Sequence, residues 1–218
     1  MRSDAQAEYP VLPVKVSTAD EMQAAITELN KNGGKMVLEL TKDISHKYFE
    51  IKNGELTVNL NEHKICVGDK LNSAKYGIEI SKTAKVTFVN GTIESTEVWR
   101  TIQSTKGDLT LKNVTLKNLA QWNAFTDSSY KIYPPTCLYV KDGTVTITGS
   151  TNITGIRAIY LEHRHYPTAD ATSPKVIIDQ GMTGTITGKQ AAICVDRANN
   201  KFIGSCDQRE AGFIQDLR

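Results

Sequence analysis

The chain has 218 residues, a net charge of +2, and 39% apolar residues. That length suits a single well-buried core, and the composition excludes general disorder. The small, evenly spread charge argues against nucleic-acid binding, and no apolar run approaches the roughly 18 residues of a membrane span.

The first residues predict an extended arm. Pro10 and Pro13 disfavour helical backbone in the residues before them, so residues 1–16 are expected to form an arm that leads into a strand. Residues 1–8 lack the apolar segment of a signal peptide, which leaves assembly inside the cell or removal of a leader as alternatives. Residues 17–218 are expected to form one domain.

One amphipathic helix follows the arm. Ser17 or Thr18 can cap it, and Glu21 lies three residues after Thr18, as in a capping box. Its apolar stripe is expected to contain Ala24, Ala25, Ile26 and Leu29. Asn32-Gly33-Gly34 ends the helix, and a strand is expected over residues 36–40.

From residue 49 onward, a three-part pattern of short strands recurs. Each part alternates apolar and polar residues, the period of a half-buried strand, and Gly, Asn, Asp and Lys separate the parts. Because one unit cannot bury its apolar face alone, the repeats predict a solenoid. The first strands of its windings are expected at 49–51, 78–80, 101–103, 138–140, 159–161 and 193–195. The second strands are expected at 56–60, 86–89, 109–111, 145–147, 176–178 and 202–203. The third strands are expected at 64–67, 92–94, 114–116, 152–153 and 184–186.

An antiparallel β-sandwich is the alternative fold. Its hairpins favour two-residue Asn-Gly turns, which Asn53-Gly54 and Asn90-Gly91 fit. The return of three unequal parts in each unit favours the solenoid.

The organisation resembles the right-handed parallel β-helix proteins of the pectin-lyase-like superfamily. The resemblance covers about residues 18–205 and is most specific in the helix that ends in Gly-Gly and in Leu-Thr-Val-Asn-Leu-Asn-Glu-His-Lys-Ile at 56–65. It implies an all-β fold, a right-handed parallel β-helix of about six three-strand turns with an N-terminal capping helix.

Stacked windings place residues distant in sequence side by side, about 4.8 Å apart. One outward column of the first strands is expected to contain Glu50, Glu79, Thr101, Tyr139, Tyr160 and Cys194. The neighbouring column is expected to contain Lys52, Ser81, Gln103, Lys141, Glu162 and Asp196.

Glu162 and Asp196 are the candidate catalytic pair. Two carboxylates about 5 Å apart suit retaining glycoside hydrolysis, and their proximity raises the pKa of one of them, as an acid catalyst requires. Together with Lys141, the same residues also fit a solvated charge ladder without a catalytic role.

Lyases of the superfamily typically bind Ca²⁺ through several aspartates and use a basic residue, often arginine, as the base. Arg157, Arg164 and Arg197 stand near the face, but no aspartate cluster accompanies them. The lack of this aspartate cluster favours a hydrolase over a lyase.

Aromatic and basic side chains are the candidate ligand-binding residues. Tyr139 and Tyr160 are expected to stack, and Trp122 lies in an aromatic insert that either binds sugar rings or folds back onto the coil. Lys141 is expected in the neighbouring column, next to Glu162 and Asp196. A second insert opens with His163, Arg164 and His165, which form either a ligand-contacting loop or a solvated loop.

No metal site or cofactor is expected. The four cysteines lack metal-ligand spacing; they are Cys66, Cys137, Cys194 and Cys206. Their even number permits two disulfides, but buried thiols within strands are the expected state.

Two classes of function follow. The first is a non-catalytic structural or binding module that contacts surface glycans, as a spike, fibre or decoration protein of a bacteriophage particle or as a bacterial surface adhesin. Such a protein is located on the virion or the cell surface, joins a larger assembly through the arm at 1–16, and often forms a homotrimer. The alternative is a polysaccharide-degrading enzyme, and a third candidate is a carbohydrate-binding module that uses Tyr139, Tyr160 and Trp122.

Overall fold

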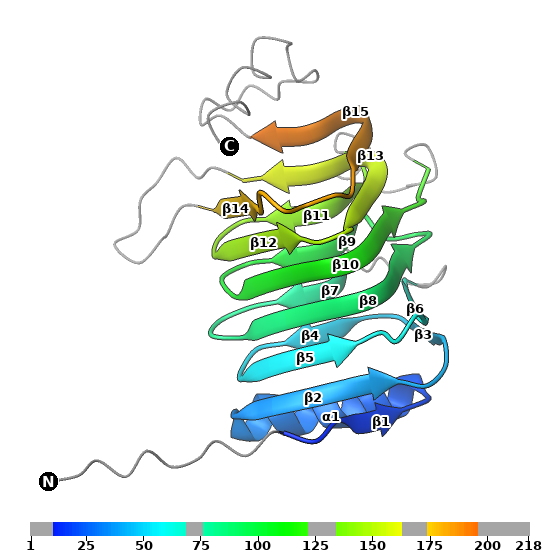
Figure 1. The fold of residues 1–218 in the computed structure, drawn as a ribbon, viewed down its shortest axis with the longest axis vertical. Coiled ribbons are helices and arrows are strands. Elements are labelled where there is room, and N and C mark those ends of the chain that lie inside the picture. The colour runs from blue at the N-terminus through cyan, green and yellow to red at the C-terminus, as the bar shows by residue number, and fades with distance from the viewer. Residues whose placement is uncertain (1–10, 69–75, 122–133, 163–173, 196–218) are drawn as a thin grey trace, which may run out of the picture.

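The protein is all-β apart from one helix in the residues that the structure describes. This computed structural model describes residues 11–68, 76–121, 134–162 and 174–195 (Figure 1). They contain α1 (Ala19–Asn32) and strands β1 to β15. The paired strands recorded among them are all parallel and form one curled, solenoid-like sheet.

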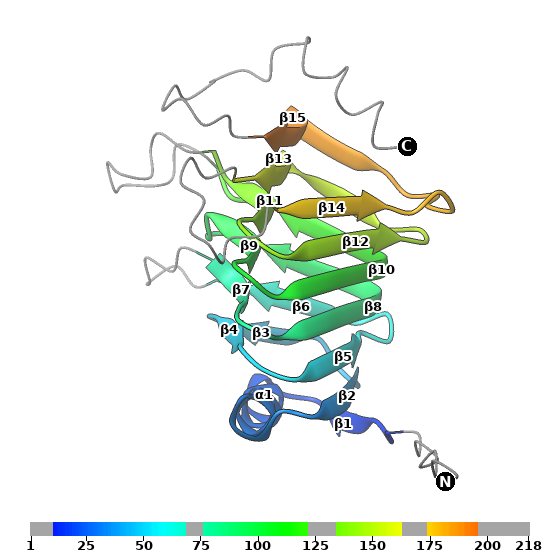
Figure 2. The same ribbon diagram turned by 90° about the vertical axis from the view of Figure 1, so that its left-hand side faces the viewer.

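The predicted capping box at the start of α1 is confirmed. The Glu21 amide donates to Thr18 Oγ1 at 3.2 Å, and the Glu21 carboxylate accepts from the Thr18 amide at 3.2 Å. The buried face differs from the predicted stripe, because Met22 joins Ile26 and Leu29 while Ala24 is exposed. The helix lies at the N-terminal end of the strand stack (Figures 1 and 2).

Three ladders of parallel strands build the stack. The first contains β2 (Lys35–Leu40), β5 (Glu55–Asn59), the starts of β8 (Lys85–Ser95) and β10 (Asp108–Asn118), β12 (Thr144–Thr148) and β14 (Lys175–Ile178). The second contains β3 (Ile44–His46), β6 (Lys64–Val67), the ends of β8 and β10, and the starts of β13 (Asn152–Leu161) and β15 (Ile186–Val195). The third contains β4 (Phe49–Ile51), β7 (Tyr76–Ile80), β9 (Arg100–Ser104), β11 (Thr136–Val140) and the ends of β13 and β15.

Parallel pairing contradicts the β-sandwich alternative. Asn53-Gly54 connects β4 to β5, which belong to different ladders, so it does not close a hairpin. Asn90 lies inside β8 at a φ of 57°, where the strand passes from the first ladder to the second. Both Asn-Gly pairs therefore mark corners of the coil, which need the same backbone conformations as tight turns.

The predicted strand positions agree with the ladders, with three differences. The short strand β3 was not expected, and at 184–186 only Ile186 is in a strand. Second and third strands are continuous in β8 and β10, as are third and first strands in β13 and β15. The strand expected at 202–203 lies outside the described residues.

Val14–Val16 forms β1 and pairs with β2. The last three residues of the expected arm therefore belong to the sheet, and residues 1–10 lie outside the described part.

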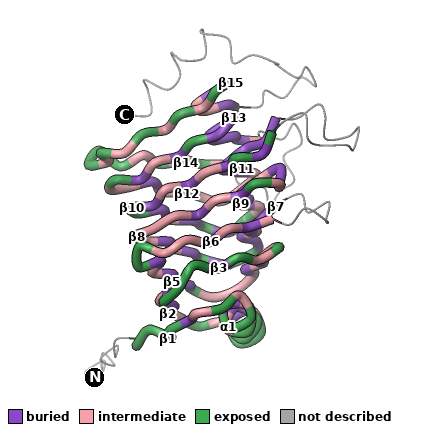
Figure 3. Tube along the Cα trace, turned by 90° about the vertical axis from the view of Figure 1, so that its right-hand side faces the viewer, coloured by how far each residue is buried: buried purple, intermediate pink, exposed green. Residues whose placement is uncertain are grey.

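Buried residues recur on successive windings of the coil (Figure 3), and they form one hydrophobic core along the stack. One inward column of the first ladder contains Leu38, Val58, Phe88, Leu111, Ile147 and Ile178. All of these up to Ile147 are fully buried, whereas Ile178 is half-buried. Other inward residues of the last described winding, such as Val176 and Ile193, are also only partly buried. Burial of the core therefore weakens at this end of the described stack.

Candidate functional site

The third ladder carries a surface pocket of about 250 Å³. It lies over β9, β11 and the end of β13. Its lining residues are Trp99, Arg100, Pro134, Thr136, Tyr139, Arg157, Tyr160 and Glu162.

Two tyrosines form the centre of the pocket wall. Tyr139 and Tyr160 are direct strand partners, and their rings stack with centroids 5.3 Å apart at an interplanar angle of 10°. The predicted stacking is confirmed. It follows from parallel strands, which place the same ring type at the interstrand spacing on successive windings.

Both tyrosines are largely buried, at 7% and 8% exposure. The guanidinium carbon of Arg100 lies 3.3 Å from the centroid of the Tyr139 ring, which also stacks on the Tyr160 ring. Cys194, the next strand partner of Tyr160, packs in the same buried cluster beyond it. Little of either ring is therefore open to the pocket. Sugar stacking on an open ring face, the basis on which these residues were proposed as ligand contacts, does not fit this arrangement.

Two arginines lie in one strand-partner column. Arg100 and Arg157 are both paired with Thr136, which lies between them. Arg157 is 3% exposed, its Nε donates to Gln190 Oε1 at 3.0 Å, and its guanidinium carbon lies 5.4 Å from the Tyr160 ring centroid. Both arginines therefore line one small pocket.

Arg100 is held between aromatic rings. Its guanidinium carbon also lies 4.8 Å from the Trp99 ring centroid, and its Nη1 donates to Gln103 Oε1. Burial lowers the pKa of Arg100, while the nearby Tyr139 and Glu162 oppose that shift. An arginine remains charged despite such a shift, since its ordinary pKa is far above neutrality.

Glu162 is the one carboxylate among the described lining residues. The Tyr139 hydroxyl donates a hydrogen bond to Glu162 Oε2. The lining residues thus include two arginines, a carboxylate and two hydroxyl-bearing residues, Tyr139 and Thr136, of which Thr136 donates its hydroxyl to the Pro134 carbonyl at 3.2 Å.

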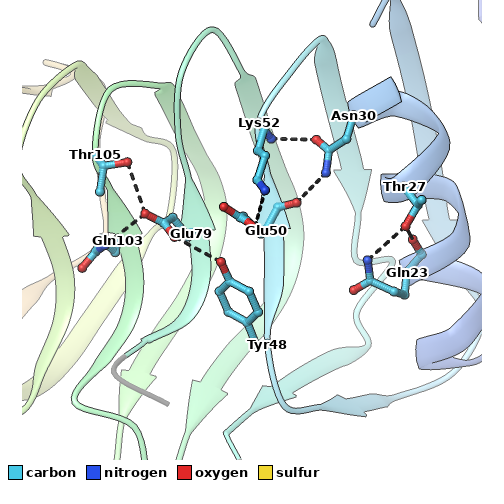
Figure 4. Close-up of polar contacts among 9 residues, drawn as sticks. All are labelled: Gln23, Thr27, Asn30, Tyr48, Glu50, Lys52, Glu79, Gln103 and Thr105. Atoms are coloured by element: carbon cyan, nitrogen blue, oxygen red, sulfur yellow. Dashed lines mark hydrogen bonds and ion pairs between the residues drawn. The ribbon is translucent and has the colours of Figure 1, made fainter. Parts of the chain in front are cut away.

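A polar network centred on Glu79 lies beside the pocket on the same ladder (Figure 4). Glu79 accepts hydrogen bonds from Tyr48 Oη at 3.1 Å, Gln103 Nε2 at 3.3 Å and Thr105 Oγ1 at 3.3 Å. Burial raises the pKa of Tyr48, and the charge of Glu79 adds to that shift. We call Tyr48, Glu79, Gln103 and Thr105 the Glu79 network.

The structure corrects both predicted columns at β9. Gln103 pairs with both Glu79 and Tyr139, so it occupies the place predicted for Thr101. Thr101 is fully buried, and its hydroxyl lies 2.6 Å from that of Ser95. The prediction was wrong because the pattern Thr-Ile-Gln is polar at both ends, so alternation alone does not say which end continues the column.

The structure places the predicted site residues unevenly. Tyr139, Tyr160 and Glu162 lie together in the pocket, whereas Lys141 is not among its lining residues. The other candidates lie outside the described residues; they are Trp122, His163, Arg164, His165 and Asp196. The proposed pair of Glu162 and Asp196 therefore remains a prediction. The residues just before them, Leu161 and Val195, are strand partners.

Arg100 and Thr136 are pocket residues that sequence reasoning missed. Counting back two residues from the aligned Ile102, Leu138 and Ile159 places Arg100, Thr136 and Arg157 in one column. By alternation that column should face the core. The strands begin at a corner of the coil, and there the inward positions open into the pocket instead.

The described residues contain no cluster of three or more His, Cys, Asp or Glu side chains suited to a metal ion. Cys66 and Cys137 are free thiols, and burial raises the pKa of the Cys137 thiol to about 12. Cys206 lies outside the described part of the chain. No helix in that part has the length and apolar character needed to cross a bilayer.

No protein-family model matches this chain, and no curated protein or solved structure matches it.

Proposed function

We propose that the protein is a non-catalytic binding module whose pocket on the third ladder takes a glycan, preferentially one with acidic sugars. The observation that carries the proposal is the convergence of Arg100 and Arg157 on one pocket beside Glu162. Guanidinium groups bind carboxylates through paired, charge-assisted hydrogen bonds, and a carboxylate acceptor suits sugar hydroxyls. Recognition then rests on hydrogen bonds and charge rather than on stacking against an open ring face.

The position of the pocket supports this proposal. Its side chains come from three adjacent strands of a stacked sheet, so their spacing is set by the backbone hydrogen bonds. Rigid placement of a few polar groups is what specific small-ligand sites require.

Titration with glycans tests the proposal. We expect an oligosaccharide that contains glucuronate to bind more tightly than its neutral glucose counterpart. Arg100→Gln and Arg157→Gln should each weaken the acidic ligand about tenfold or more, the effect of losing one charge-assisted hydrogen bond. Lys112→Gln, an exposed lysine of β10 outside the pocket, is the matched control and should bind normally. Equal affinity of both arginine variants and the wild type would contradict the proposal.

A polysaccharide-degrading enzyme is the second candidate, since the Glu162 carboxylate lies inside the pocket and accepts from Tyr139. Incubation with the bound glycan, followed by detection of new reducing ends or unsaturated products, separates the two candidates. Products that disappear in Glu162→Gln and Asp196→Asn favour the enzyme. Binding without any product favours the module.

We propose further that the coil is a right-handed β-helix of about six three-strand turns with α1 as its cap, as in the pectin-lyase-like superfamily. The three parallel ladders and the position of α1 at the end of the stack support this.

The setting we propose is a phage particle or a bacterial surface, with the N-terminal arm as the attachment segment and a homotrimer as the assembly. Because β1 pairs with β2, the attachment test should delete only residues 1–10 and leave Val14–Val16 in place. Incorporation should be lost on this deletion, and light scattering of the intact protein should give three times the chain mass.

A further inference from the structure

A continuous line of side-chain contacts crosses the third ladder from the Glu79 network into the pocket. Glu79 contacts Gln103, Gln103 contacts Arg100, and Arg100 lies over the Tyr139 ring. Tyr139 in turn donates to Glu162. The contacts join residues of β7, β9 and β11 with Glu162, which directly follows β13.

Gln103 gives Arg100 a directional contact. The ring faces of Trp99 and Tyr139 attract the guanidinium, and a hydrogen bond with the Tyr139 side chain adds to this. Attraction to a ring face by itself leaves the group free to turn in its own plane. A hydrogen bond from Nη1 to the amide oxygen of Gln103 has a preferred direction and restricts that turn.

Glu79 sets which way the Gln103 amide points. The carboxylate of Glu79 faces Nε2, and the guanidinium of Arg100 faces Oε1. A flipped amide would place a donor against the guanidinium and an acceptor against the carboxylate, and both hydrogen bonds would be lost. Tyr48 and Thr105 hold Glu79 itself in place through its two oxygens.

We propose that Gln103 is the positioning residue for Arg100, and that Glu79 acts through Gln103 by fixing the orientation of its amide. Gln103 is 5% exposed and is not a lining residue of the pocket, so it acts on a ligand through Arg100. The effect on glycan affinity depends on the proposed function. The effect of Gln103 on the position of the Arg100 guanidinium is independent of that function.

Proton NMR of the intact chain tests the placement without any ligand. Protons of a guanidinium held over an aromatic ring resonate upfield, and Arg100→Lys identifies the Arg100 signals by their loss. We expect these signals to move toward unperturbed positions in Gln103→Met, which keeps the length but lacks the acceptor, and in Gln103→Asn, which is too short to reach both partners. Lys64→Met is the matched control, since Lys64 lies in β6 of the second ladder, pairs with Glu94 at 2.9 Å and does not belong to the Glu79 network. Unmoved signals in both Gln103 variants would overturn the proposal.

Glycan titration then tests the consequence. With the glucuronate oligosaccharide as probe, we expect Gln103→Met to weaken binding about fivefold to tenfold. A change of this size corresponds to the loss of the one hydrogen bond between Arg100 and Gln103. The double variant with Arg100→Gln should bind no more weakly than Arg100→Gln alone, because Gln103 has no role once Arg100 is gone. Additive losses would show that Gln103 acts independently of Arg100 and would overturn the proposal. If no glycan binds the wild type, the proposed function fails, while the NMR result still decides the role of Gln103.

Discussion

Single residues at the corners of the coil decide which polar groups enter the core. Thr101, Cys137 and Ala158 are fully buried although alternation assigns them to the outer face. Their side chains are small, and two of them form hydrogen bonds: Thr101 with Ser95, and Cys137 Sγ with the Thr154 carbonyl at 3.0 Å. Burial of a polar atom is tolerated when a partner replaces water.

His46 should make stability depend on pH. It stacks on Phe49 with ring centroids 4.6 Å apart, and burial lowers its pKa below the ordinary 6.5. His46 therefore binds a proton less readily in the folded state than in the unfolded chain. The stability that neutral His46 contributes is lost as the pH falls below about 6.5, where the unfolded chain begins to take up this proton. We expect the free energy of unfolding in urea to drop more between pH 7.5 and pH 5.5 in the wild type than in His46→Gln.

The comparison between the two pH values isolates this effect, because the lost stacking on Phe49 lowers the stability of His46→Gln at both. The dependence of unfolding on urea should have the same slope in both proteins. An equal drop in the two proteins would show that His46 does not carry the effect.

At the scale of elements, local signals and contacts between windings act together. The box at Thr18 and Glu21 starts α1 by pairing amides that a helix leaves without partners. Strand boundaries depend instead on the neighbouring winding. Ser104, for example, pairs with both Ile80 and Val140.

At Gly143, the corners of two successive windings lie in close contact. Its φ is 86°, and an added Cβ would lie 2.4 Å from the Gly107 carbonyl oxygen of the preceding winding. Gly34 is the matched control, since its φ is 84° and nothing lies within 4 Å of the same position. We expect Gly34→Ala to cost about 1–2 kcal/mol from backbone strain alone. Gly143→Ala should cost roughly 1–3 kcal/mol more, because the neighbouring corner must move. Urea unfolding measures the loss of stability in both variants. Equal losses would mean that the corner at Gly143 has room for a Cβ next to the preceding winding.

At the scale of the whole molecule, the core is a single stack whose burial differs along its length. Phe88 and Leu111 in the middle windings are fully buried, whereas Val176, Ile186 and Ile193 in the last described winding are partly exposed. Each winding rests on its neighbours, so stability in such a stack is mainly a nearest-neighbour property.

Hydrogen exchange should follow this difference. We expect amides of β8 and β10 to exchange more slowly than those of β14 and β15, because local opening of the last described winding exposes less new apolar surface. Exchange measured by mass spectrometry on peptides from these strands checks it. The control is β5, which lies toward the end where α1 packs and should be protected like β8. Uniform protection along the stack would contradict a stability gradient.

The sequence by itself determined the class of fold, the limits of α1 and the approximate position of most strands. These features depend on local alternation, capping chemistry and turn residues, which act over a few positions of the chain. It also placed Tyr139 over Tyr160, because each tyrosine follows the equivalent inward residue of its winding, Leu138 or Ile159.

Only the tertiary structure decided which residues form the pocket. Arg100 belongs to it because the start of β9 lies at a corner, where an inward position opens to the surface. Gln103, rather than Thr101, continues the outward column because the register of β9 pairs it with Glu79 and Tyr139. The burial of Tyr139 and Tyr160 likewise depends on side chains from other windings. Alternation along a strand describes one strand at a time, whereas a site on a solenoid is assembled across strands, and its register is set by the windings on either side.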